Sequence, residues 1–388
     1  MSKLIDGVER RLDATEKKAQ NKPDSLDIDD VMHRFSLDVV LRCLYKQEDV
    51  TNFNLNQKDH WVEMVEVGLW GMCLNPLLRF AIHIPALRHL IDFLAMNFHP
   101  SGKWRQELMQ FVRAQARLGL EARKHLEEMR QNGQQVADEN NFTLKDGRKF
   151  RRNMVDSIVD QLQMGKITQT EYMNTSWFLF SAADKTTADA LSFTVFQLAK
   201  NAEIQEKLRQ SIGSHGVESQ YLSWVINESL RLHPPVPAAS RATSQELKLG
   251  TGHVFPPNTI VLLPLYTIHR LEQYWGDDAD EFRPERWADE DKFHPCQFMP
   301  FGAGLRRCLG RDLALFEMRL LLCALLDRYR FGKPSGAGLN GWSGQVEFYA
   351  PLSTFLLHKT PLFVSISRVE NTRKLGEPKQ EKTLEKFE

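Results

Sequence analysis

The spacing of apolar positions predicts the first helices. In residues 27–45, Val31, Phe35, Val39 and Val40 share one helical face, and the acidic first turn is typical of a helix N-terminus. Residues 99–131 form a longer amphipathic stretch, which predicts a second, exposed helix. The polar residues 132–153 that follow predict an exposed, mobile loop.

A buried helix is predicted for residues 168–201. Thr168 and Glu171 form a capping box, and the residues after them are apolar on nearly every side. Residues 220–237 predict another helix, which Pro234 and Pro235 bring to an end.

The remaining segments add a small β region. Short β-branched runs separated by Gly and Pro predict strands between Ala239 and Ile268. A further helix is expected from just after Cys308 to about Tyr329, then a terminal β-hairpin over residues 346–369. The charged tail from Arg373 is expected to be disordered. The pattern as a whole predicts a mainly α fold with a small β region.

Composition narrows the possible functions. The 388 residues include 50 basic and 50 acidic side chains, so the formal net charge is zero and nucleic acid is not expected as the main partner. The five cysteines are odd in number and form no C-x-x-C pair, which favours a reducing compartment over a disulfide framework. The sequence contains no apolar run long enough for a transmembrane helix, and its first residues are too charged for a signal peptide.

Cys308 differs from the other cysteines in its surroundings. Cys43, Cys73 and Cys323 are expected to be small buried hydrophobic residues, and the position of Cys296 is uninformative.

The stretch "FMPFGAGLRRCLG" places Cys308 just before a predicted helix and beside Arg306 and Arg307. A helix N-terminus and two arginines all favour the thiolate over the thiol. Glycines at positions 302, 304 and 310 would let a large, flat group approach the backbone.

Three roles for such a thiolate can be compared. A nucleophile needs a histidine base, and none of the 12 histidines lies in a recognisable cysteine-enzyme setting. A zinc site needs further ligands at short spacing, and His294 has no such companion. A haem iron accepts one cysteine thiolate as its sole protein ligand, and here the glycines would give a porphyrin room and the arginines could neutralise its propionates.

The stretch "FMPFGAGLRRCLGRDLA" resembles the haem-binding loop of the cytochrome P-450 family, F-x-x-G-x-R-x-C-x-G-x-x-x-A. The matching residues are Phe301, Gly304, Arg306, Cys308, Gly310 and Ala314. The resemblance implies a cytochrome P-450 fold and a haem b whose iron Cys308 ligates. It also implies that Arg306 contacts a haem propionate and that Phe301 packs close to the thiolate.

Three further segments extend the resemblance. "NESLRLHPPVP" contains the family's Glu-x-x-Arg as Glu228 and Arg231, and "EFRPERW" adds Arg286. In the family these three residues form a structural cluster on the haem-loop side of the core. Arg241 stands where many relatives hold a second propionate contact.

The stretch "SAADKTT" resembles the family's Ala-Gly-x-Asp/Glu-Thr-Thr, whose acid and first threonine relay protons to bound dioxygen. Aligned on the threonines, Thr186 takes the alcohol position, Lys185 takes the acid position and Asp184 comes one residue early. Either the relay is altered, or a local bulge lets Asp184 keep the acid role. We expect Thr186 and Asp184 to be catalytic.

The resemblance implies a monooxygenase that inserts one atom of dioxygen into an apolar substrate. Electrons would come from NADPH through NADPH–cytochrome P-450 reductase, for which Arg307 and Arg311 are candidate contacts. Residues 266–287 are similar to the fatty-acid hydroxylase branch, so a long-chain fatty acid is expected before a steroid or other small lipid. The substrate contacts expected by position are Phe178, Phe180, Ala182, Pro237, Ala238, Ala239, Thr354 and Phe355.

The resemblance covers residues 1–368 and leaves 369–388 as the charged tail. It implies an N-terminally truncated fold that lacks the family's first strands and helices, together with its membrane anchor. The full-length form is expected at the cytosolic face of the endoplasmic reticulum membrane. Two alternatives remain open: a haem-thiolate isomerase or dehydratase that needs no reductase, and an inert haem-binding remnant.

Overall fold

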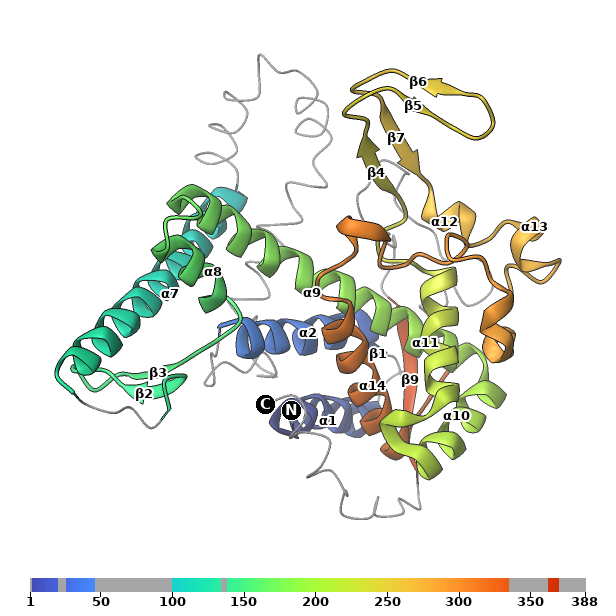
Figure 1. Cartoon of the computed structure of the whole chain (residues 1–388). Coiled ribbons are helices and arrows are strands. Elements are labelled where there is room, and N and C mark those ends of the chain that lie inside the picture. The colour runs from blue at the N-terminus through green and yellow to red at the C-terminus, as the bar shows by residue number, and fades with distance from the viewer. Residues whose placement is uncertain (1, 20–25, 46–99, 134–137, 335–361, 370–388) are drawn as a thin grey trace. The chain divides into compact units, whose positions relative to one another are not determined.

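The computed structural model describes residues 2–19, 26–45, 100–133, 138–334 and 362–369, and these are mainly helical, as expected (Figure 1). The chain divides into two compact units. One comprises Met1–Val8 and His33–Lys185, and the other comprises Glu9–Met32 and Thr186–Glu388.

Three helices contribute residues to both units, because the boundaries fall inside them. They are α1 (Ser2–Ala19), α2 (Ile28–Tyr45) and α9 (Gln169–Lys200). The helix predicted for residues 27–45 is thereby confirmed, and its predicted apolar face is buried.

The other elements of the first unit are α7 (Pro100–Gln131), α8 (Asp156–Gln163) and the short strands β2 (Asn141–Thr143) and β3 (Lys149–Arg151). The long helix predicted from the amphipathic pattern is confirmed as α7. Arg123 of α7 forms an ion pair with Asp160 of α8 and donates to the carbonyl of Asp156 at 2.6 Å, so these two helices are joined at one end of the unit.

The prediction of an exposed loop after α7 is wrong in its second half. Strands β2 and β3 pair antiparallel there, and the rings of Phe142 and Phe150 lie 5.2 Å apart. Leu144 and Phe150 are buried against Ala122 of α7. The polar composition concealed this hairpin because only these few apolar side chains, on one face, hold it to the helix.

The capping box at the start of α9 is confirmed. The Thr168 hydroxyl accepts from the Glu171 amide at 3.2 Å, and the Glu171 carboxylate accepts from the Thr168 amide at 2.7 Å. Two donors that the helix leaves without partners are thereby satisfied. Most residues of the second half of α9 are buried, as its apolar pattern predicts, whereas Thr186 and Gln197 are half-buried.

Within the second unit, α9 contacts α11 (Gln220–Leu232) through the Thr194–Ser229 hydrogen bond and α10 (Ala202–His215) through the Gln205–Leu198 hydrogen bond. This unit also contains α14 (Arg311–Arg328), the short helices α12 (Leu265–Ile268) and α13 (Glu272–Trp275) and the 3-10 turns η3 (Gly216–Glu218), η4 (Pro284–Lys292) and η5 (Gly304–Arg306). Helix α11 ends just before the two prolines, as expected, and α14 matches the helix predicted after Cys308.

The second unit also contains the small sheets. In Figure 1, β4 (Ala239–Ala242) pairs with β7 (Ile260–Leu263), and β5 (Leu247–Lys248) pairs with β6 (Val254–Phe255). The strands predicted in this region are therefore confirmed as far as Leu263, whereas the residues that follow form α12.

A third sheet has the order β1-β9-β8, formed by β1 (Leu26–Asp27), β9 (Phe363–Arg368) and β8 (Tyr329–Gly332). The terminal hairpin was predicted for residues 346–369, and its described strand, β9, pairs with β8 and β1. The first part of that hairpin and the tail from residue 370 lie outside the described residues. Among the described helices, none combines the length and apolarity needed to cross a membrane.

Candidate functional site

Cys308 lies in a tight loop of the second unit, which we call the cysteine loop (298–310). The loop opens with a turn in which the Gly302 amide donates to the Met299 carbonyl at 3.0 Å. Gly302 and Gly304 have φ angles of 68° and 67°, in the left-handed region that disfavours any residue with a Cβ. Glycine is therefore required at both positions by the backbone path itself.

The end of the loop folds back onto its middle. The Cys308 amide donates to the Phe301 carbonyl at 2.8 Å, and Gly310 caps the N-terminus of α14. The thiol of Cys308 is exposed and free. Two residues separate Cys308 from the 18-residue helix α14, the second of them the N-cap Gly310.

The glycines leave the space beside the thiol open. A Cβ built at Gly304 would meet nothing within 4 Å, and one at Gly310 would lie 4.0 Å from the Cys308 sulfur. A single accessible sulfur donor next to backbone without side chains fits a flat macrocycle ligated through one thiolate. The loop therefore has the donor and the clearance that a haem needs.

Arginines supply positive charge on the same unit. Arg306 and Arg307 follow one another in the loop, and Arg241 lies on β4; all three are exposed. Within the described ranges, none of the three forms an ion pair, and Arg241 donates only to the neighbouring Ser240 carbonyl at 2.8 Å. Their guanidinium groups could therefore bind carboxylates such as haem propionates.

The predicted cluster of Glu228, Arg231 and Arg286 is present and buried, and we call it the Glu–Arg–Arg cluster. Arg231 contacts Glu228 with two donors, each at 2.9 Å, and Arg286 Nε donates to Glu228 Oε1 at 2.8 Å. The carboxylate also accepts from the Arg283 amide at 2.9 Å and from Trp287 Nε1 at 3.1 Å. Five donors thus converge on one carboxylate that has no solvent exposure.

The arginines of this cluster also hold backbone carbonyls. Arg231 donates to Ala279 at 2.5 Å, and Arg286 donates to Trp275 at 3.2 Å and to Asp278 at 3.0 Å. Through these bonds the cluster fixes the backbone of the segment between α13 and η4.

Sequence reasoning did not single out the aromatic group that joins this cluster to the cysteine loop. Trp287 donates to Glu228, and its ring lies 4.5 Å from that of Phe298, the first residue of the loop. Trp275, Phe293 and Trp224 belong to the same group. The available signal was the tryptophan that directly follows Arg286 in "EFRPERW".

On α9, Thr186 and Ala182 lie on one half-buried face, with Phe178 a further turn back and 62% exposed. The helix is α-helical from Gln169 to Lys200 with no π turn, so the bulge considered for Asp184 is not formed. At 100° per residue, Asp184 points to nearly the opposite side of the helix from Thr186. The structure does not bring these two predicted catalytic residues together.

The side chain of Asp184 faces α2 within the first unit. Its carboxylate lies 3.5 Å from His33 Nδ1, and its backbone carbonyl accepts from the Ser36 hydroxyl at 2.9 Å. Asp184 has no solvent exposure, and Lys185 is 7% exposed. Asp184 is thus engaged in the packing of α2 on α9.

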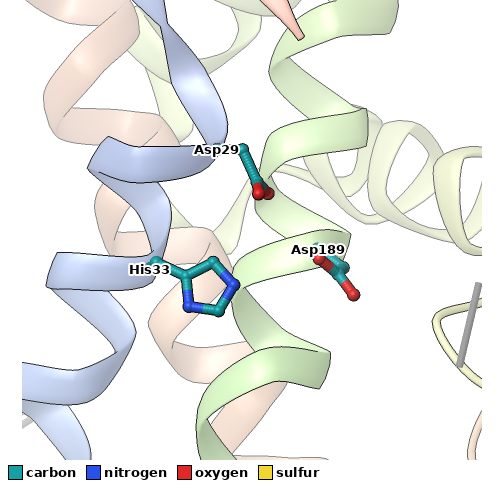
Figure 2. A group of neighbouring side chains, drawn as sticks. All are labelled: Asp29, His33 and Asp189. Carbon is teal, nitrogen blue, oxygen red and sulfur yellow. The ribbon is translucent and has the colours of Figure 1, made fainter. Parts of the chain in front are cut away.

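A second acidic group, which the sequence did not point to, lies at the start of α2. Figure 2 shows Asp29, Asp189 of α9, and His33 one turn further along α2. The carboxylate oxygens of the two aspartates lie within 4.8 Å of each other, and Ser192 Oγ donates to Asp29 at 3.1 Å. Asp29 belongs to the first turn of α2, where the helix dipole favours negative charge.

A comparison with models of known protein families shows to which family the chain belongs. The family model described as "Cytochrome P450" matches residues 1–340. The chain belongs to the cytochrome P450 family.

Curated relatives carry the same family name. The chain is 27% identical over 367 residues to "Cytochrome P450 3A40" of Oryzias latipes, covering 90% of this chain and 67% of that protein. It is 34% identical over 184 residues to "Cytochrome P450 734A1" of Arabidopsis thaliana, covering 44% of this chain and 35% of that protein. It is 28% identical over 330 residues to "Cytochrome P450 3A56" of Fundulus heteroclitus, spanning 62% of that relative. The chain thus spans about two thirds or less of the P450 relatives it matches.

The predicted substrate contacts of this P450 chain, and Ala314 of the haem-loop motif, differ in how far they are buried. Phe180 is fully buried in the first unit, and its ring lies 6.0 Å from that of Tyr45. Pro237, Ala238 and Ala239 are half-buried, and Thr354 and Phe355 lie outside the described residues. Ala314 is half-buried on the first turns of α14, where its amide bonds to the Gly310 carbonyl at 2.9 Å.

The other cysteines of the P450 chain do not share the character of Cys308. Cys323 is buried in α14, and burial raises the pKa of its thiol to about 12, which confirms its packing role. Cys43 is half-buried and Cys296 is exposed, while Cys73 lies outside the described residues.

Proposed function

We propose that this chain carries the catalytic core of a haem-thiolate monooxygenase. The observation that supports it most strongly is the cysteine loop, which presents the exposed thiol of Cys308 at the start of α14 among glycines. Cys308 would hold the iron of haem b, and Arg306 and Arg241 would pair with the propionates. When bound, haem supplies dioxygen activation and the insertion of one oxygen atom into a substrate C–H bond.

The loop residues would control the thiolate rather than take part in the oxidation. Phe301 presents its carbonyl to the Cys308 amide at 2.8 Å, which fixes the direction of the cysteine backbone. Gly304 and Gly310 keep the porphyrin side clear of side chains.

The second oxygen atom leaves as water, so the reaction needs two electrons and two protons. We infer NADPH as the electron source and NADPH–cytochrome P-450 reductase as the donor protein. Arg307 and Arg311 are exposed beside the cysteine loop, although Arg311 is paired with Asp312 at 2.9 Å. They would contact acidic residues of the reductase.

We assign the proton step to the hydroxyl of Thr186. It lies on the half-buried face of α9, which it shares with Ala182, and its Oγ would hold the proton that oxygen activation consumes. Asp184 points to the other side of α9 and contacts His33, so a direct role beside Thr186 is disfavoured. We propose that Asp184 instead acts on α9 through its packing with α2.

For the substrate we propose a long-chain fatty acid, with a steroid or other small lipid as the second choice. The resemblance of residues 266–287 to fatty-acid hydroxylases is the support for the first choice. The complete protein would act at the cytosolic face of the endoplasmic reticulum membrane, where apolar substrates accumulate.

One observation favours an alternative activity. Lys185 occupies the position of the family's acid and is only 7% exposed. A cation there does not replace a carboxylic acid in proton delivery. A haem-thiolate isomerase or dehydratase would need no reductase and no proton delivery to dioxygen. Turnover that continues without NADPH and dioxygen would select this alternative.

The test of the proposed function uses Thr186→Ala with Thr186→Ser as its matched control. NADPH consumption and product are measured together with reductase, dioxygen and a panel of long-chain fatty acids and steroids. We expect Thr186→Ala to consume NADPH without matching product, and Thr186→Ser to stay coupled because it keeps the hydroxyl. If Thr186→Ala remains as coupled as the wild type, Thr186 is not the relay residue.

A further inference from the structure

His269 contacts two features of the second unit, through Arg231, 38 residues before it, and Met299, 30 residues after it. It follows α12 directly and has no solvent exposure. Its backbone carbonyl accepts from Arg231 Nη1 at 2.9 Å, so it is bonded to the Glu–Arg–Arg cluster. Its ring Nε2 lies 3.0 Å from the backbone amide of Met299, where the cysteine loop turns. One residue therefore touches the cluster with its backbone and the loop with its side chain.

The direction of the second hydrogen bond is fixed by chemistry. A backbone N–H can only donate, so Nε2 must be the unprotonated nitrogen and the ring proton must sit on Nδ1. Burial, with the charge of Arg231 as a smaller cause, lowers the pKa of His269 to about 4. The ring is therefore neutral near pH 7, and Nε2 is available as an acceptor.

The bond to Met299 leads on to Cys308. The Met299 carbonyl accepts from Gly302 at 3.0 Å and closes the turn that opens the loop. The Phe301 carbonyl inside that turn accepts from the Cys308 amide at 2.8 Å. A shift of Met299 would thus move the group that orients the cysteine backbone. The ring of Phe298, the loop residue before Met299, lies 5.4 Å from the ring of His269 and is a second contact between His269 and the loop.

We propose that His269 is a positioning residue. Its Nε2 accepts from the Met299 amide and thereby fixes the cysteine loop relative to the Glu–Arg–Arg cluster. The inference rests on the proposed function where it concerns haem, because the loop is taken to present the iron ligand. The hydrogen bond itself does not depend on haem. The same contact can therefore be tested with and without the cofactor.

The competing explanation is that His269 only fills space between Trp275, Phe298 and the cluster. Three variants separate the two roles. His269→Gln places an amide oxygen close to the position of Nε2, His269→Asn places it near Nδ1, and His269→Leu has no acceptor. A residue that only fills space would tolerate Leu best, whereas a residue that holds Met299 would tolerate Gln best.

The first measurement is amide hydrogen exchange of Met299 in the full chain without haem. Loss of one hydrogen bond in a buried setting predicts exchange about five- to tenfold faster in His269→Leu, and near wild-type exchange in His269→Gln. Far-UV circular dichroism checks that the variants are folded. If His269→Leu does not fold, the comparison of His269→Gln with His269→Asn still separates the two roles, because only Gln places its oxygen near the position of Nε2.

The second measurement is the carbon monoxide difference spectrum of the same variants after haem loading. We expect the fraction with a red-shifted Soret band to fall in His269→Leu and His269→Asn and to recover in His269→Gln. Unchanged exchange and an unchanged band in His269→Leu would overturn the proposal, and so would a Gln variant as impaired as the Leu variant. A wild type without any red-shifted band would refute the proposed function. The amide exchange of Met299 would still test the role of His269, because it is measured without haem.

Discussion

Replacing Glu228 by glutamine tests the energetics of the Glu–Arg–Arg cluster. The change keeps the volume of the side chain and removes its charge, so the guanidinium groups of Arg231 and Arg286 lose their common counter-ion. Both lie in the interior, with 0% and 4% exposure, and therefore cannot be rehydrated without opening the core. The glutamine amide would also turn N–H donors toward donors of the arginines.

The expected loss in the free energy of unfolding follows from this burial. Removing one partner of a buried, hydrogen-bonded ion pair costs about 3–5 kcal/mol. With a urea dependence of about 2–3 kcal/mol per molar, the unfolding midpoint should fall by about 1–2.5 M. Since folded proteins have unfolding free energies of about 5–15 kcal/mol, the variant should lose a large part of its stability.

The assay is urea unfolding followed by far-UV circular dichroism, with Glu206→Gln as the control. Glu206 also pairs with two arginines, Arg330 at 2.8 Å and Arg209 at 3.5 Å, but its side chain is 39% exposed. The control should lose less than about 1 kcal/mol, because water screens an exposed pair. If the two variants lose the same free energy, the cluster does not stabilise the fold in the way described here.

Three further outcomes follow from the structure. Thr168→Ala should cost about 1 kcal/mol in urea unfolding because it removes the cap of α9, and an unchanged midpoint would contradict the role of the capping box. Gly304→Ala should cost about 1–2 kcal/mol because φ is 67°, whereas Gly310→Ala, where φ is −86°, should cost clearly less; equal losses would refute the backbone argument. For His269, the pKa is about 4 in the folded chain and 6.5 as the ordinary value, so the unfolded state takes up its proton first and stability is lost as pH falls from 6.5 to 4. The loss should reach about 3 kcal/mol below that window in pH-dependent unfolding, and His269→Gln should remove this component; an equally steep pH dependence in the variant would show that other groups cause it.

The cysteine loop could be predicted in detail because its signals are local. Gly304, Arg306, Cys308 and Gly310 fall within seven consecutive residues, and two of the loop glycines have the left-handed backbone that their residue type suggests. The capping box of Thr168 is local in the same sense. Such features depend on neighbours in sequence, which the sequence displays directly.

Features that depend on packing could not be predicted in the same way. Phe142 and Phe150 form a hairpin face only because α7 offers Ala122 as a surface for them. The side chain of Asp184 points toward His33 because α2 packs on α9 there. The alignment of motifs instead groups Asp184 with Thr186.

The contacts around Glu228 show the same limit. Arg231 and Arg286 were expected to pair with it, but the donor groups of Trp287 and the Arg283 backbone were not. The contact from His269 to Met299 joins residues 30 positions apart in sequence, and no spacing rule connects them. These contacts arise only when several elements of the second unit meet.

The central claim is that Cys308 ligates haem iron as a thiolate, and one spectrum tests it most directly. The full chain is loaded with haem, reduced and exposed to carbon monoxide, beside a Cys308→Ser variant that is identical in far-UV circular dichroism. The account predicts a red-shifted Soret band in the wild type and its loss in Cys308→Ser, because serine does not provide the sulfur ligand. A wild type without the red shift, or a red shift that persists in Cys308→Ser, would contradict the account.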